Sequence, residues 1–392
     1  MATPLSDPPL ASLIAAHQSG YALPRDFYVS PDIYARDLEL LQNRWIYAGH
    51  ISELAKAGDW ITAELANDSA IVIRDATGTL KAFANVCRHR GSRLCVGTSG
   101  NAKLLVCPYH AWTYTHDGAL RAAPQMPAGF VAAEHGLHPL PLAVIGGLIF
   151  ISFGAQPPAL DTAGPALTKM FSRYQWPTAK IAHRALYPVK ANWKLDLENY
   201  HECYHCTPQH PEFAQLHALA RPGQRTLAID ADASGYADVE DWSAEANGRE
   251  PVRMMRSALS EGCHTGSKSG ALLAPLMGPD DGHCLFGELG FLSAFLAYAD
   301  YGVIYRFAPK GLAISEIEVI WLVSGDAVEG RDYDLAALTW LWDVTSIADK
   351  RIIETNQAGV ASRFYSPGPF STMEPGARQF VDRYLAELAA SL

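Results

Sequence analysis

Two short segments decide the fold of this chain: CRHRG at residues 87–91 and CPYH at residues 107–110. The first has the spacing C-x-H, the second has the spacing C-x-x-H, and seventeen residues separate His89 from Cys107. Each follows a β-rich run and enters a loop with a glycine or a proline, so the loops could close on one metal unit from opposite sides. Two thiolates and two imidazoles suit a tetrahedral zinc ion or a [2Fe–2S] cluster with histidine on one iron.

The distribution of the ligands favours the cluster. Zinc sites usually take two cysteine pairs, or a cysteine pair and then a histidine pair, whereas each loop here offers one residue of each kind. In a [2Fe–2S] centre each loop can give cysteine to one iron and histidine to the other, and neutral imidazoles raise the reduction potential. Zinc stays open as the alternative. We interpret Cys95 as a small buried thiol, and Tyr109 and Trp112 either cover the cluster from solvent or simply pack.

The sequence around these loops predicts an antiparallel β module from about residue 45 to residue 155. Short β-rich runs, such as 70–74 and 80–86, are separated by turn residues such as those at 76–78. The apolar run 142–153 is shorter than the ~20 residues of a membrane-spanning helix, so it reads as two buried strands around Gly146 and Gly147. Residues 1–44 form an N-terminal segment, in which a helix begins at Pro31 with Tyr34, Leu38, Leu41 and Trp45 at helical spacing.

Beyond a linker candidate at 156–158, residues 156–392 mix helices and strands. We expect a helix over 192–206 that stops at Thr207-Pro208, a strand over 312–323 and a long helix over 334–359. The chain is therefore predicted to be α+β, with helices packed on an antiparallel sheet in its second half.

Composition excludes several classes of protein. The chain is 49% hydrophobic and 18% charged, which excludes a disordered chain. The net charge of −10 argues against nucleic acid or a membrane surface as the main partner. Residues Met1–Asp7 show no secretory signal, and seven cysteines suit a reduced cytoplasm, with thiols that serve metals or packing and not a disulfide framework.

A second constellation is the acid- and histidine-rich segment ENYHECYHCTPQH at residues 198–210. Glu202 and His205 are three residues apart, so they would share one helix face. His210 lies past Pro208, where the chain can fold back beside His205. Two histidines and one carboxylate, with open positions, form the site of a non-haem Fe(II) that binds O₂ and substrate.

Asp349 is the candidate for the third ligand. On the predicted helix 334–359 it shares a face with largely apolar residues: Trp342, Thr345, Ile352, Ile353 and Asn356. A carboxylate among apolar neighbours is costly unless it is paired or binds a metal. The alternative is a buried acid satisfied by a helix cap or an arginine.

Together these motifs resemble those of Rieske non-haem iron oxygenases. The first constellation, continued to Trp112, looks like the Rieske motif; Glu202-x-x-His205-x4-His210 and the helix of Asp349 look like the iron site. The resemblance implies an N-terminal all-β Rieske domain (45–155) and a C-terminal helix-grip catalytic domain (156–392), with residues 1–44 packed on the latter. It implies that the [2Fe–2S] ligands are Cys87, His89, Cys107 and His110, and that the ligands of the mononuclear Fe(II) are His205, His210 and Asp349.

The resemblance also implies a head-to-tail homotrimer. In it Glu202, at a position that is commonly aspartate in the family, would link His110 of one subunit to His205 of another. Asn199 matches a family residue near the iron, but an ordinary polar helix residue is an equal interpretation. We interpret His201, on another face of the predicted helix, either as structural or as a residue that supports the iron site without binding the metal.

No G-x-G-x-x-G stands at a strand–helix junction, so we expect a separate NAD(P)H-linked flavin and iron–sulfur reductase. The form ECYHC at 202–206 and the tail 357–369 look most like the branch that acts on quaternary amines such as glycine betaine, carnitine, stachydrine and choline. The expected function is that of a terminal oxygenase, either mono- or dioxygenase, that hydroxylates an N-methyl or other C–H group and so demethylates a quaternary ammonium compound. The alternatives are ring hydroxylation of an aromatic acid, a Rieske-type electron carrier and a zinc-binding protein.

A cation pocket for such a substrate needs aromatic faces and a carboxylate. One region offers these groups, although an aromatic stripe is more often core: Phe286, Glu288, Phe291, Phe295, Tyr298, Tyr301 and Tyr305.

Overall fold

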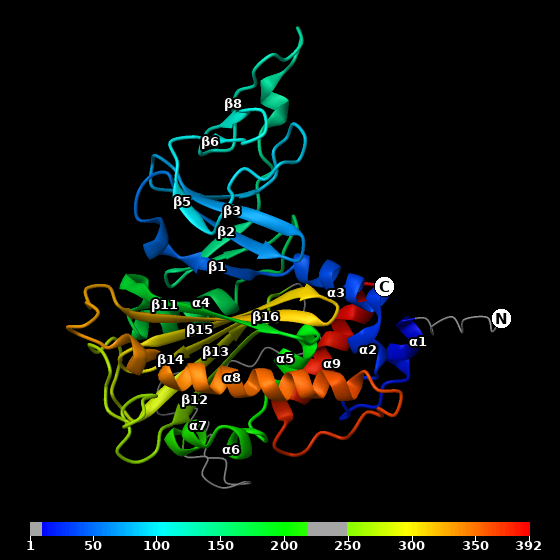
Figure 1. The fold of residues 1–392 in the computed structure, drawn as a ribbon, viewed down its shortest axis with the longest axis vertical. Coiled ribbons are helices and arrows are strands. Elements are labelled where there is room, and N and C mark those ends of the chain that lie inside the picture. The colour runs from blue at the N-terminus through cyan, green and yellow to red at the C-terminus, as the bar shows by residue number, and fades with distance from the viewer. Residues whose placement is uncertain (1–9, 218–248) are drawn as a thin grey trace, which may run out of the picture.

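The computed structural model describes residues 10–217 and 249–392, so the segment Met1–Asp7 lies outside the described residues. Figure 1 shows a β-rich part standing on a larger part, in which helices cover an extended sheet. Within the described ranges, the helices are all too short or too polar to cross a membrane.

The β-rich part contains three small sheets with strand orders β1-β10-β9, β4-β3-β2-β5 and β6-β7-β8, all antiparallel. The predicted runs 70–74 and 80–86 correspond to β3 and β4, and the run 142–153 forms the hairpin β9–β10. Gly146 and Gly147 make its turn with φ of 55° and 90°, a region that favours glycine. The strands are β1 (Ile46–His50), β2 (Asp59–Leu65), β3 (Asp68–Arg74), β4 (Leu80–Ala84), β5 (Ser99–Asn101), β6 (Leu105–Val106), β7 (Thr113–Tyr114), β8 (Leu120–Ala122), β9 (Leu142–Ile145) and β10 (Leu148–Ile151), with 3₁₀ turns at Ile51–Leu54 and Ala132–His135.

The larger part is built on a six-stranded antiparallel sheet of order β11-β16-β15-β14-β13-β12. The predicted strand 312–323 is β16, a central strand, and the predicted helix 334–359 is α8, which packs on β11 and β16 (Figure 1). The strands are β11 (Ala179–Val189), β12 (Val252–Ala258), β13 (His283–Leu289), β14 (Ser293–Ala297), β15 (Gly302–Gly311) and β16 (Ile314–Ser324). The helices are α4 (Ala163–Arg173), α5 (Trp193–Tyr200), α6 (Cys206–Gln209), α7 (Pro211–Leu216), α8 (Leu335–Val360) and α9 (Pro375–Ala390), with a 3₁₀ turn at Trp176–Thr178.

The N-terminal helices α1 (Leu10–Ala15), α2 (Asp26–Val29) and α3 (Pro31–Gln42) pack against this larger part. The fully buried Asp37 of α3 accepts hydrogen bonds from Tyr384 Oη at 2.6 Å and Trp193 Nε1 at 3.1 Å, and it pairs with Lys194. Helix α3 ends at Gln42, so the expectation that Trp45 continues it is wrong.

The predicted single helix over 192–206 is also wrong. Helix α5 ends at Tyr200, a turn follows, and a separate short helix α6 begins at Cys206. The Glu202 carboxylate accepts the backbone N–H groups of Tyr204 and His205, an alternative to continued helix. Pro208 does not stop the second helix but lies in its first turn, where a missing N–H costs nothing.

Candidate metal centres and substrate pocket

The first constellation converges at the tip of the β-rich part. Cys87 and His89 follow β4, Cys107 and His110 follow β6, and the ring centroids of the two histidines are 4.6 Å apart. Both cysteines are buried and their thiols contact each other. The ring of Trp112 stacks on His89 with centroids 4.9 Å apart and planes 9° from parallel.

The donor set fits a [2Fe–2S] cluster with mixed ligands. Within the described part of the chain, Nδ1 of His89 is buried and has no hydrogen-bond partner, as a metal-binding nitrogen would be before the metal is added. Backbone N–H groups of Tyr109 and His110 are directed at the Cys107 sulfur, which favours a thiolate there.

Residues near the cluster loops partly follow the expectations. Trp112 is buried and stacks on His89, whereas Tyr109 is 56% exposed and its ring lies against that of His110, with centroids 3.8 Å apart. Cys95 is the buried thiol that we expected, and burial raises its pKa to about 12.

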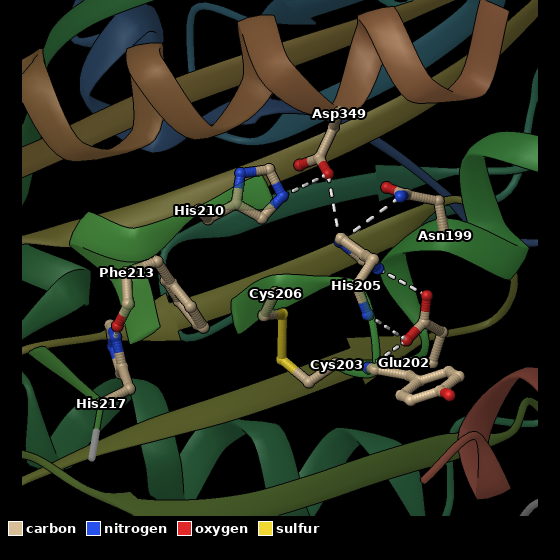
Figure 2. The surroundings of a disulfide bond; sticks show 10 residues. Asn199, Glu202, Cys203, His205, Cys206, His210, Phe213, His217 and Asp349 are labelled. Atoms are coloured by element: carbon tan, nitrogen blue, oxygen red, sulfur yellow. Dashed lines mark hydrogen bonds and ion pairs between the residues drawn. A yellow bond between two sulfur atoms is a disulfide. The ribbon is translucent and has the colours of Figure 1, made fainter. Parts of the chain in front are cut away.

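The second constellation assembles from two distant segments. His205 and His210 border α6, Asp349 comes from α8, and the potential ligand atoms of these three residues lie within 4.8 Å of one another (Figure 2). Asp349 Oδ1 is 2.8 Å from His210 Nε2 and 3.2 Å from His205 Nε2. The three side chains therefore lie close enough together to bind one metal ion as a facial triad.

The electrostatics of these three residues fit a cation. Burial alone would raise the pKa of Asp349, but the contacts with both histidines hold it below the usual value. Burial lowers the pKa of His205, but Asp349 and Glu202 together raise it to about 9. In the described ranges, the buried Nδ1 of His210 has no partner. A divalent metal ion would supply the positive charge that these groups attract, in place of protons.

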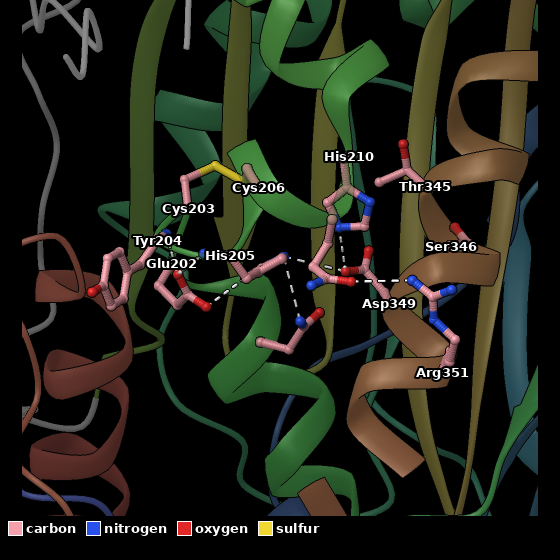
Figure 3. A network of polar contacts seen from close by, with 12 residues as sticks. Glu202, Cys203, Tyr204, His205, Cys206, His210, Thr345, Ser346, Asp349 and Arg351 are labelled. Carbon is pink, nitrogen blue, oxygen red and sulfur yellow. Dashed lines mark hydrogen bonds and ion pairs between the residues drawn. A yellow bond between two sulfur atoms is a disulfide. The ribbon is translucent and has the colours of Figure 1, made fainter. Parts of the chain in front are cut away.

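Glu202 and Asn199 contact His205 at its two different ring nitrogens. Glu202 Oε1 lies 2.5 Å from His205 Nδ1, while Oε2 accepts the backbone N–H of His205 at 3.2 Å (Figure 3). This contact fixes the imidazole so that Nε2 faces Asp349. The Asn199 amide nitrogen is 3.4 Å from the same Nε2 atom. His201 points elsewhere: it pairs with Glu288 at 3.3 Å and stacks on Phe380.

One feature of this segment was not expected from the sequence. Cys203 and Cys206 form a disulfide with Cα atoms 4.8 Å apart, whereas the other five cysteines are free. The expectation that the cysteines serve only metals or packing is therefore wrong for this pair. Their C-x-x-C spacing was the signal that could have indicated it.

A pocket beside the three candidate iron ligands is lined by aromatic and charged side chains. Of the seven residues proposed for a cation pocket, Phe286, Glu288 and Tyr305 line it. The other four, namely Phe291, Phe295, Tyr298 and Tyr301, are buried in the core. Sequence reasoning missed Tyr200 and Phe213 as aromatic lining residues, and it missed Arg253, whose Nη1 is 3.7 Å from Glu288 Oε1.

Comparison with known proteins agrees with these two centres. Residues 44–141 match the model of the Rieske [2Fe-2S] domain, and residues 176–390 match that of the ring hydroxylating alpha subunit (catalytic domain). The chain is 35% identical to the glycine betaine monooxygenase oxygenase subunit of Chromohalobacter salexigens, covering 98% of this chain and 91% of that protein. It is 34% identical to the carnitine monooxygenase oxygenase subunit of Escherichia coli K12, covering 89% and 86%.

Solved structures share the fold. The quaternary ammonium Rieske monooxygenase CntA with L-carnitine gives a TM-score of 0.72 at 22% identity, covering 99% of both chains. Naphthalene 1,2-dioxygenase from Rhodococcus gives 0.69 at 18% identity, covering 97% of both. The match to the catalytic domain covers residues 176–390 of the chain. It therefore excludes two of the alternatives considered from the sequence, a zinc-binding protein and a simple electron carrier. The chain belongs to the ring-hydroxylating alpha subunits of Rieske oxygenases, enzymes that carry a Rieske [2Fe–2S] cluster and a mononuclear iron.

Proposed function

We propose that this terminal oxygenase removes an N-methyl group from a small betaine, using O₂ and electrons from a separate reductase. Hydroxylation of the methyl C–H consumes O₂, an electron pair and protons, and releases water. The resulting carbinolamine then breaks its C–N bond to give formaldehyde and the demethylated amine. The names of the two relatives, glycine betaine and carnitine monooxygenase oxygenase subunits, support this substrate class.

The observation that carries the proposal is the pairing of aromatic faces with an arginine in the pocket. The Tyr305 ring contacts the rings of both Tyr200 and Trp342, with centroids 5.5 Å and 5.8 Å away, and all three residues line the pocket. Aromatic faces attract a quaternary ammonium through cation–π interactions, which need no hydrogen-bond donor on the ligand. Arg253 lines the same pocket beside Glu288 and supplies a guanidinium for the carboxylate of a betaine.

We assign roles to the site residues as follows. Cys87, His89, Cys107 and His110 hold the cluster; His205, His210 and Asp349 hold the iron. When bound, the cluster supplies single electrons and the iron supplies the means to activate O₂. Glu202 orients His205, and Asn199 borders the iron-facing nitrogen of that histidine.

The proposed assembly is a head-to-tail homotrimer, in which Glu202 contacts His110 of an adjacent subunit. The similar carnitine-oxidising monooxygenase, at TM-score 0.72, is described in terms of inter-subunit electron transfer, which supports this arrangement. The proposed reductase is NAD(P)H-linked and carries a flavin and an iron–sulfur centre. We place the enzyme in the cytoplasm and the domain boundaries near residues 45 and 156.

A single-turnover experiment tests the substrate class without the natural reductase. The purified holoenzyme is reduced chemically, mixed with O₂ and a candidate substrate, and analysed for formaldehyde and the demethylated amine. Glycine betaine is compared with 3,3-dimethylbutanoate, which has the same shape without the positive charge, and with salicylate. Formaldehyde from the betaine, with no hydroxylated product from 3,3-dimethylbutanoate or salicylate, supports the proposal. A hydroxylated ring from salicylate, and no formaldehyde from any methylammonium compound, would establish the aromatic-acid alternative instead.

A further inference from the structure

The disulfide between Cys203 and Cys206 encloses one of the proposed iron ligands. The four-residue ring that it closes contains Tyr204 and His205. Glu202, whose carboxylate orients the His205 imidazole, directly precedes this ring. The covalent link therefore lies in the same turn as the carboxylate–imidazole pair (Figure 2).

The turn has few other restraints of its own. It joins the end of α5 at Tyr200 to the start of α6, and Cys206 N–H reaches Cys203 O at 3.3 Å. The Tyr204 side chain is 53% exposed. The Glu202 carboxylate and the disulfide therefore both hold this turn, together with backbone hydrogen bonds at its two ends.

Both cysteines line the pocket, and Cys203 is the more accessible of the two because Cys206 is buried. Cys203 and Cys206 line the same pocket as the three candidate iron ligands, and Cys203 is only half-buried. Small oxidants and thiols that enter the pocket can reach the pair. Accessible C-x-x-C disulfides belong to the labile, exchangeable kind, in contrast to the inert disulfides of secreted frameworks.

We propose that Cys203 and Cys206 form a redox-active thiol–disulfide site whose closed state holds Glu202 and His205 in position for the mononuclear iron. Closing the bond with peroxide oxidises two thiols, forms the S–S bond and yields water from both peroxide oxygens. Opening it requires a dithiol: one thiolate attacks Cys203 Sγ, Cys206 leaves as a thiolate that takes up a proton, and the second thiol of the reductant resolves the mixed disulfide.

This inference rests on the ligand role proposed for His205, but not on the identity of the substrate. With the ring open, the backbone from Cys203 to Cys206 regains conformational freedom, and the side-chain contacts of His205 must hold the imidazole in place without the covalent link. Loss of a contact that orients a metal-binding histidine typically weakens metal binding about tenfold or more. The cluster ligands lie in the β-rich part and should be unaffected.

The test measures the oxidation state of the pair and the release of iron in the holoenzyme. Alkylation followed by non-reducing peptide mass spectrometry should find Cys203 linked to Cys206, and treatment with dithiothreitol should expose both to alkylation. The half-buried Cys263 serves as the free-thiol reference in the same spectra. In a chelator, the dithiothreitol-treated enzyme should then lose its mononuclear iron about tenfold faster, with an unchanged Rieske EPR signal.

Matched variants separate the disulfide from side effects of the reductant. The double variant Cys203→Ser/Cys206→Ser should release iron at the fast rate with or without dithiothreitol, whereas Cys263→Ser should respond as wild type. Two free thiols that persist after peroxide treatment, or an iron-release rate independent of the state of the pair, would overturn the inference. The variant His205→Ala separates failure of the proposed ligand role from failure of the present inference. If His205→Ala keeps its iron, the ligand assignment is wrong. If His205→Ala loses its iron but the state of the cysteine pair has no influence on iron release, only the present inference is wrong.

Discussion

At the scale of single residues, Asp349 is the group that connects two distant segments at the proposed iron site. Its Oδ1 atom faces both His205 and His210, whereas Asp343 on the same helix bonds the Tyr187 hydroxyl at 2.6 Å. We expect Asp349→Ala to lower the mononuclear iron content about tenfold or more, because a facial triad without its carboxylate loses both charge and a ligand. The measurement is the total iron content relative to the absorbance of the Rieske cluster. The control variant Asp343→Asn should keep its mononuclear iron.

Glu202 permits a sharper separation of roles. Glu202→Gln keeps the size of the side chain and a hydrogen-bonding group beside His205 but removes the negative charge. We expect the cluster to stay reducible and the iron to stay bound, while turnover falls about tenfold or more, because the link to the neighbouring cluster is weakened. Stopped-flow reduction, iron analysis and product formation give the three readouts. Unchanged turnover with a reducible cluster would falsify the bridging role.

Asp196 should make stability depend on pH. This residue of α5 is 1% exposed, and burial raises its pKa to about 8, above that of an unfolded chain. The folded protein therefore holds the proton more tightly, so this contribution to stability is complete below about pH 4 and is lost as the pH rises towards about 8, by up to ~1.4 kcal/mol per pH unit.

Asp196→Asn removes this titration. Urea unfolding from pH 5 to pH 8 should show a smaller loss of stability for Asp196→Asn than for wild type. Asp32→Asn, at an exposed position of α3, should follow wild type. Parallel curves for wild type and Asp196→Asn would contradict the assignment.

The site residues that belong to short sequence motifs could be predicted from the sequence. Those that come together only when the chain folds were missed. The cluster loops and the pair His205 and His210 are short patterns, so residue chemistry alone pointed to metals. Arg253 and Tyr200 carry no such pattern, because they reach the pocket from strand β12 and from the end of α5. Asp349 could be found because an acid on an apolar helix face is unusual wherever its partners lie.

At the scale of elements, hydrophobic periodicity predicted the long helix and the long strand correctly, but it missed the turn between α5 and α6. Helix α8 and strand β16 begin and end within two residues of the expected positions. The break between α5 and α6 was missed because the intervening residues have acceptable helix propensity, and the carboxylate of Glu202 competes with the helix for backbone N–H groups. Local hydrogen bonding of this kind overrides propensity.

Substitutions in the turn of the β9–β10 hairpin should lower the stability of the protein, because this turn contacts the larger part of the molecule at Pro177. Gly147 has φ of 90°, and a Cβ atom there would lie 2.9 Å from both His50 Nε2 and the Pro177 Cα. Gly78, between β3 and β4, has φ of 86° but nothing within 4 Å of such an atom. Gly78→Ala should cost about 1–2 kcal/mol from the backbone alone, and Gly147→Ala about 1–3 kcal/mol more from the clash.

Thermal unfolding of the two glycine variants at equal metal content compares these costs. The melting temperature of Gly147→Ala should lie clearly below that of Gly78→Ala. Equal melting temperatures would show that the turn can move away from His50 and Pro177 without loss of stability. The packing of the turn against these residues would then contribute little to the stability of the fold.

At the scale of the whole molecule, the two metal centres belong to different ends of one chain. The sheet β6-β7-β8, from which Cys107 extends, lies in the upper region of the β-rich part, away from the larger part, whereas α6 and α8 lie on the other side of the six-stranded sheet (Figure 1). The sequence predicted both parts but not this separation, because strand order depends on contacts between distant residues. We therefore expect each iron to receive its electrons from the cluster of a neighbouring subunit, as in the proposed trimer.

Mixed assemblies test that arrangement directly. Cys107→Ala removes a cluster ligand and Asp349→Ala removes an iron ligand, so an assembly of either variant alone should be inactive. In a head-to-tail trimer formed from equal amounts of both, about a quarter of the interfaces place an intact cluster beside an intact iron of the next subunit. Co-expression with two different tags and purification on both removes the homotrimers. Each mixed trimer then has one productive interface in three, so its demethylation activity should be about a third of that of wild type. If electrons passed only within one chain, every mixed trimer would be as inactive as its parents, and the proposed role of Glu202 between subunits would fall with it.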